Sequence, residues 1–214
     1  MFKNINKVIR ILVITDFFYN AAFASFAPVF AIFIAGTIVG GSASVAGYAT
    51  AVYWVTKSAV QLPIARFLDR SDGENHNFLA MFWGYLASGL IPILYIFAKT
   101  PMHLYVIQAL YGIIMAFAVP SWYAIFTRHV DTWRVSFEWS LESVFAVGVS
   151  TAGAAALGGF VADRFGFQAL FIGASVVSLV ASLLLLSLKK YLLPHKSEEN
   201  VLPEREHHRR IGRM

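Results

Sequence analysis

The chain has 214 residues, of which 58% are hydrophobic and only 14% are charged, whereas an average soluble domain is about half apolar and a quarter charged. This composition predicts an integral membrane protein that lies in the lipid bilayer. Cysteine is absent, which excludes disulfides, thiolate metal sites and cysteine nucleophiles. The net charge of +5 gathers in a basic tail without interleaved aromatic residues, so nucleic acid is not an expected partner.

Six segments are long and apolar enough to cross a bilayer, which takes about 20 residues per helix. They are residues 11–39, 46–68, 78–97, 104–126, 137–161 and 167–188. Backbone polar groups in lipid must be satisfied within each segment, so these segments predict helices. We therefore expect an all-α six-helix bundle over residues 1–190, followed by a charged, disordered tail over residues 191–214.

The positive charges predict the orientation of the bundle. Lys and Arg residues lie before the first segment, around the second and fourth linkers, and after the sixth segment, whereas only Lys99 and Arg164 fall on the opposite side. Because Lys and Arg favour the cytoplasmic face, both termini are predicted to be cytoplasmic, in the cytoplasmic membrane.

Three charged residues lie inside the predicted spans: Asp16, Lys57 and Glu142. A charge near the bilayer centre costs about 2.5–3.5 kcal/mol on insertion scales, so it must be paired, hydrated or used. Each shares a helix face with a polar residue four positions away, respectively Asn20, Gln61 and Glu138. We expect these faces to meet in a wet cavity where Lys57 pairs with Asp16 or Glu142. The second carboxylate would then be free for proton coupling, although static pairs that only join helices are the alternative.

Other side chains are candidates for a substrate cavity or for helix packing. The candidate cavity residues are Tyr19, Asn20, Gln108, Tyr111 and Trp122. The fifth segment carries Gly153, Gly158 and Gly159, which predict the close approach of another helix. No phosphate-binding loop, catalytic pairing or metal-ligand spacing is present in the sequence, so neither an enzyme nor a metal or other cofactor is expected.

A weak internal repeat relates the two halves of the chain. Pro28 matches Pro120, a shift of 120 − 28 = 92, and Asp69 matches Asp163, a shift of 163 − 69 = 94. Both shifts place the first three segments on the last three. Because three helices reverse the direction of the chain, the repeats are predicted to be inverted.

The stretch Ala65-Arg66-Phe67-Leu68-Asp69-Arg70 resembles the loop between helices two and three of major facilitator superfamily transporters. That motif reads Gly-x-x-x-Asp-(Arg/Lys)-x-Gly-(Arg/Lys)-(Arg/Lys). Ala replaces the first Gly here, and Ser71-Asp72-Gly73-Glu74 departs from the remainder. Residues 108–112 and 154–159 resemble degraded forms of that family's helix-four and helix-five motifs.

The resemblance implies secondary active transport of a small organic solute by alternating access. The family has twelve helices in two halves, so six helices imply a half-size transporter that works as a parallel homodimer, with proton coupling through Asp16, Lys57 and Glu142. A cytoplasmic gate would include Ala65 and Asp69, with Arg66 or Arg70 of one copy reaching Glu138 of the other. Two alternatives stay open: the N-terminal half of a longer transporter, or a membrane scaffold or assembly protein that does not transport.

Overall fold

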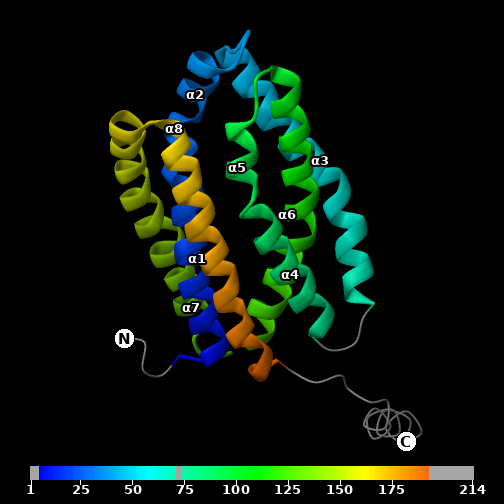
Figure 1. Cartoon of the computed structure of the whole chain (residues 1–214). Coiled ribbons are helices and arrows are strands. Elements are labelled where there is room, and N and C mark those ends of the chain that lie inside the picture. The colour runs from blue at the N-terminus through cyan, green and yellow to red at the C-terminus, as the bar shows by residue number, and fades with distance from the viewer. Residues whose placement is uncertain (1–4, 71–73, 193–214) are drawn as a thin grey trace, which may run out of the picture.

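The computed structural model describes residues 5–70 and 74–192, and every regular element in these ranges is helical. The elements are α1 (Lys7–Phe26), η2 (Ala27–Val29), α2 (Phe30–Thr37), α3 (Ala43–Asp69), α4 (Asn75–Ser88), α5 (Ile91–Ile96), α6 (Pro101–His129), α7 (Val135–Leu141), η3 (Glu142–Val149), α8 (Ser150–Leu184) and η4 (Leu185–Tyr191). They lie side by side as a bundle, with the start of α1 and the end of η4 at the same end (Figure 1).

Proline and glycine set the breaks between successive helices. Pro28 lies in the short 3-10 segment η2, where the chain passes from α1 into α2, because proline cannot supply the amide hydrogen that a continuous helix needs. Pro92 stands in the first turn of α5, just after the break that ends α4. Within α8 the chain reverses at Gly166, whose φ of 80° is a left-handed value that glycine adopts without steric cost.

Four segments of the described chain are long and apolar enough to cross a membrane: 7–37, 75–96, 101–129 and 135–191. The last of these has 57 residues and includes the reversal at Gly166. α3 is not among the four, because Lys57 and Gln61 lower its hydropathy. Length and hydropathy therefore give four spanning segments in the described chain, fewer than the six predicted.

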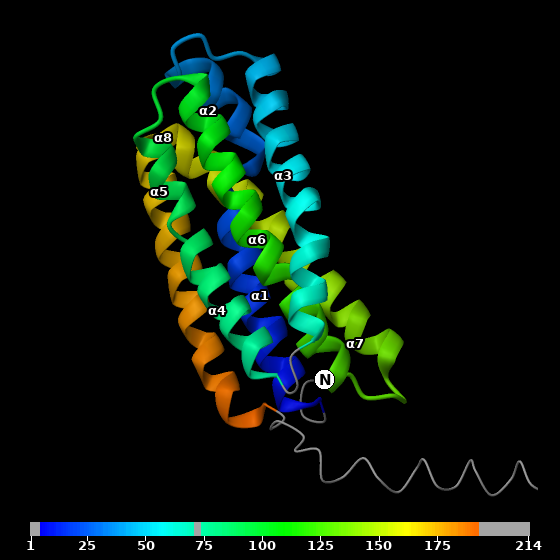
Figure 2. The ribbon, with the colours of Figure 1, turned by 90° about the vertical axis from the view of Figure 1, so that its right-hand side faces the viewer.

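Long helix pairs build the bundle. α1 packs along α8, while α3 packs along α6, and α4 packs against both α6 and α8. α3 consequently lies at the edge of the bundle, and Figure 2 shows it on the same side as α7. The largest fully buried side chains include Tyr95, Phe126 and Phe171, so aromatic residues fill much of the space between the helices.

Gly158 lies where α8 crosses α1. A Cβ atom added to Gly158 would overlap the backbone carbonyl of Ser25, whereas Cβ atoms at Gly153 and Gly159 would meet nothing within 4 Å. Of the three glycines proposed for helix packing, Gly158 is thus the one that permits a close helix contact within the chain. The other two leave open positions on α8.

This difference predicts opposite effects of two alanine substitutions in one helix. Gly158→Ala should lower the midpoint of thermal unfolding in detergent, because forcing a carbon against a backbone carbonyl costs about 1–3 kcal/mol. Gly159→Ala is the matched control and should leave the midpoint unchanged or raise it, because alanine is favoured over glycine in helices by about 1 kcal/mol. Equal midpoints for the two variants would show that α1 and α8 are not in close contact at Ser25.

Candidate functional site

A cavity of about 320 Å³, here called the acidic cavity, lies between α1, α4, α6, α7 and η3. It combines acidic, aromatic and apolar side chains, and no Lys, Arg or His is among the described residues that line it. The lining residues are Asp16, Tyr19, Asn20, Tyr85, Met115, Val119, Trp122, Tyr123, Trp139, Glu142, Ser143 and Val147. The predicted residues Asp16, Glu142, Tyr19, Asn20 and Trp122 are thereby brought together around one space.

α1 and α4 fix the first carboxylate of the cavity. Asp16 on α1 is only 7% exposed, and the hydroxyl of Tyr85 on α4 donates a hydrogen bond of 2.8 Å to its Oδ1 atom. The ring of Tyr85 stacks on that of Tyr19, with 4.2 Å between centroids. The hydroxyl of Tyr19 in turn lies 2.7 Å from the Oγ atom of Ser88. Asp16 is therefore held at a defined position in the wall.

The second carboxylate belongs to Glu142, the first residue of a π-helical segment, η3. π-helical turns are rare and occur frequently at functional sites, because they displace side chains from the regular helical positions. Glu142 is 6% exposed, and its carboxyl group shares the cavity wall with that of Asp16, close enough for the two charges to interact directly. No N–H or hydroxyl donor among the described residues reaches its buried Oε2 atom.

Lys57 does not line this cavity, which corrects the expectation that it pairs with Asp16 or Glu142. Its Nζ atom lies over two rings of its own helix, 4.9 Å from the centroid of Trp54 and 5.8 Å from that of Tyr53. The reason is the packing of the bundle: α3 lies along α6 at the edge, whereas Asp16 and Glu142 face each other across α1 and η3. The two acids therefore lack the predicted cationic partner.

Gln108 and Tyr111 line a second cavity, of about 240 Å³, together with Phe23, Tyr53 and Tyr95 among others. Ring contacts link the linings of the two cavities. Tyr19 packs on Phe23 with 4.9 Å between centroids, and Tyr111 stacks on both Phe23, at 5.2 Å, and Tyr53, at 4.8 Å. The predicted substrate residues thus divide between two cavities whose linings are joined by aromatic contacts.

Tyr85 and Trp139 line the acidic cavity but were not predicted from the sequence. Tyr85 had a detectable signal, since Ser88 follows it three positions later on the same face of an apolar segment. Trp139 had no sequence signal for a cavity role, because an aromatic residue near a span end is ordinarily a membrane-interface residue.

The residues of the predicted loop gate lie at the end of α3. Arg66, Asp69 and Arg70 are exposed there and Ala65 is half-buried, while residues 71–73 fall outside the described ranges. Glu138 is fully buried, and its Oε2 atom accepts a hydrogen bond of 3.0 Å from the backbone N–H of Asp131. Its burial within one protomer leaves little of Glu138 for an arginine of a second copy to reach.

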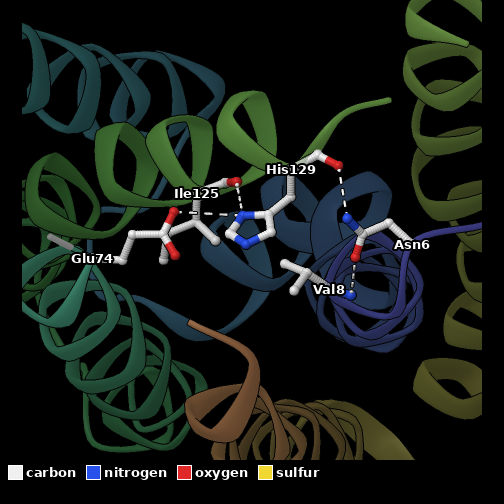
Figure 3. A network of polar contacts seen from close by, with 5 residues as sticks. All are labelled: Asn6, Val8, Glu74, Ile125 and His129. Atoms are coloured by element: carbon white, nitrogen blue, oxygen red, sulfur yellow. Dashed lines mark hydrogen bonds and ion pairs between the residues drawn. The ribbon is translucent and has the colours of Figure 1, made fainter. Parts of the chain in front are cut away.

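A polar network joins three segments at the end of the bundle where α1 begins (Figure 3). The Nδ1 atom of His129, at the end of α6, lies 3.5 Å from the Oε1 atom of Glu74, just before α4. The side-chain amide of Asn6 donates a hydrogen bond of 3.1 Å to the carbonyl of His129. Asn6 also caps α1 by accepting a hydrogen bond of 2.9 Å from the N–H of Val8. The network fixes the starts of α1 and α4 to the end of α6.

The chemistry of the acidic cavity is that of binding and proton exchange. Within residues 5–70 and 74–192 there is no group of three His, Asp or Glu side chains that could hold a metal ion. Two carboxylates that share one cavity with aromatic rings can take up or release a proton and can attract a positive charge.

Comparison with known proteins gives one family. The family model described as Major Facilitator Superfamily matches residues 12–213 of the chain. No curated protein matches the chain.

Proposed function

The chain is an integral membrane protein of the major facilitator superfamily, a transporter family, and we propose that it moves a small organic solute by proton-coupled alternating access. The observation that carries the proposal is that Asp16 and Glu142 line one cavity, with no cationic side chain among its described lining residues. Two carboxylates close to each other do not both stay ionised easily and tend to share a proton. Such a pair can exchange a proton when the solute enters or leaves.

We also propose six membrane spans arranged as two inverted repeats of three. α3 and the reversal at Gly166 supply the two spans beyond the four most apolar segments. The repeat would superimpose Pro28, which lies in η2 after α1, on Pro120, which lies within α6. An even number of spans agrees with the start of α1 and the end of η4 lying at one end of the bundle, and the basic residues favour the cytoplasm for that end.

A second copy of the chain completes the transporter in this proposal. Two copies inserted in the same direction, related by a two-fold axis along the membrane normal, would give the two-bundle architecture on which alternating access depends. α3 and the first part of α8 offer apolar surfaces for such contact, including Trp54 and Val55 on α3 and Leu157 and Phe160 on α8, all more than half exposed. The open positions at Gly153 and Gly159 lie on this part of α8.

Proteoliposomes with a pH-sensitive dye in the lumen test the proposal. The purified chain is reconstituted, and cationic, neutral and anionic small organic solutes are added in turn under equal starting pH. We expect at least one solute to change the lumenal pH in liposomes that contain the wild-type chain and not in empty liposomes. If no solute of any charge class changes the lumenal pH, proton-coupled transport is contradicted. Stability loss without any transport phenotype in cavity variants would instead favour the scaffold.

A further inference from the structure

The lining of the acidic cavity carries information about the charge of its ligand. Asp16 and Glu142 both contribute carboxyl groups, and the described lining includes no Lys, Arg or His to neutralise them. Lys57, the cationic partner predicted from the sequence, contacts Trp54 and Tyr53 instead. The Oε2 atom of Glu142 is buried without a hydrogen-bond donor from the described chain. An unsatisfied buried acceptor is costly, so a ligand that brings positive charge would stabilise it.

Aromatic rings surround the two acids. Trp122 and Trp139 lie edge to face with 6.2 Å between centroids, and Tyr19 and Tyr85 stack beside Asp16. The faces of such rings attract cations, most strongly when water is excluded. Acids surrounded by aromatic rings are suited to an alkylammonium group, whose diffuse charge is weakly hydrated.

The remainder of the cavity is apolar, with Met115, Val119 and Val147 in its wall. Its volume of about 320 Å³ is near the lower end for small-molecule sites. A ligand that fills it therefore needs a compact apolar group beside its charge. Inorganic cations have no such group, and anions would meet the carboxylates directly.

We propose that this cavity binds a small organic cation, an amine or quaternary ammonium attached to an apolar group. The inference deepens the proposed transport function and rests on it for the role of the site. When the cation enters, the proton shared by Asp16 and Glu142 leaves for the water at the cavity mouth, so that one positive charge replaces another. The titratable groups that line the cavity are Asp16 and Tyr19 from α1, Tyr85 from α4, Tyr123 from α6 and Glu142 from η3. Of these, the two carboxyl groups are the stronger acids, because a tyrosine hydroxyl ordinarily has a pKa of about 10.

Equilibrium binding of radiolabelled benzyltrimethylammonium to the full chain in nanodiscs tests this inference. The competitors are the unlabelled cation, its uncharged isostere neopentylbenzene, and the anion benzylsulfonate. We expect competition by the cation alone, and an affinity that rises with pH because binding releases a proton. Equal competition by neopentylbenzene, or binding of benzylsulfonate, would overturn the proposal, and so would the absence of cation binding.

Substitutions in the acidic cavity test whether the cation binds there. Glu142→Gln and Trp122→Leu should each weaken binding at least about tenfold, consistent with loss of a desolvated charge or cation–π contact. Trp122→Phe retains an aromatic face and should show a smaller loss, which separates the contact from general misfolding. Asp163→Asn and Trp83→Leu, both exposed, are the matched controls and should bind like wild type. Unchanged binding by the two cavity variants would place the cation elsewhere and refute the assignment.

The two proposals fail differently. Cation binding without any solute-evoked pH change in liposomes would leave the site intact and contradict transport. A pH change evoked only by neutral or anionic solutes would support transport and contradict the cationic ligand.

Discussion

Asp16→Asn should abolish the movement of protons that a transported solute evokes in proteoliposomes, with the rate falling at least about 100-fold. The amide of asparagine retains an acceptor for the Tyr85 hydroxyl, which lies 2.8 Å from the carboxylate in the wild-type chain, but it cannot take up or release a proton. Only one carboxyl group, that of Glu142, would then remain in the cavity wall. We expect the same loss for Glu142→Gln.

An assay of solute exchange distinguishes a variant that has lost proton coupling from one that has lost all transport. If the carboxyl pair carries the proton, the single variants should still exchange labelled for unlabelled solute across the membrane, although with weaker affinity. Asp163→Asn makes the same chemical change at an exposed position of α8 and serves as the control for reconstitution. Full proton movement in Asp16→Asn or in Glu142→Gln would exclude the corresponding carboxyl group from coupling.

Purified heterodimers should show that two copies act together. We expect a dimer that joins one wild-type chain to one Glu142→Gln chain, isolated through two different affinity tags, to retain far less than half of the wild-type rate. The reason is that one rocking unit contains both bundles, so a defect in either copy interrupts the cycle. Independent monomers would instead keep about half of the rate, because only one of each two chains is defective.

Native mass spectrometry in nanodiscs is the companion measurement for the heterodimer experiment. A species near twice 23.7 kDa is expected under mild activation. A strict monomer, together with half-maximal activity in the mixed preparation, would contradict the homodimer. That result would favour the alternative in which the chain pairs with a different half, as the N-terminal part of a longer transporter would.

The sequence predicted which carboxylates line the cavity, but it did not predict correctly which side chain pairs with them. A carboxylate inside an apolar segment is costly wherever the helices lie, so hydropathy and charge alone select Asp16 and Glu142 as candidates. The position of Lys57 could not be predicted in the same way, because pairing depends on which helices are neighbours. Hydropathy does not reveal that α3 packs on α6 and not on α1.

The finer geometry of the site was also beyond sequence patterns. The π-helical segment from Glu142 to Val149 contains no proline that would mark a departure from the regular α-helix in the sequence. The break at Pro28 and the reversal at Gly166 are different, because proline and glycine restrict or extend the backbone directly. The predicted spans 137–161 and 167–188 leave a gap that includes Gly166, whereas the single predicted span 11–39 missed the break at Pro28. Which helices are neighbours, and how the candidate residues divide between two cavities, could not be predicted.

The most direct test of the central claim is calorimetric titration of the purified chain with a solute that evokes the pH change in liposomes. Repeating the titration in two buffers of different ionisation enthalpy gives the number of protons released per solute bound. The shared proton of Asp16 and Glu142 predicts release of up to about one proton by the wild-type chain, and none by Asp16→Asn, since binding and protonation are reciprocally linked. Absence of release from the wild-type chain, or undiminished release from Asp16→Asn, would contradict the account.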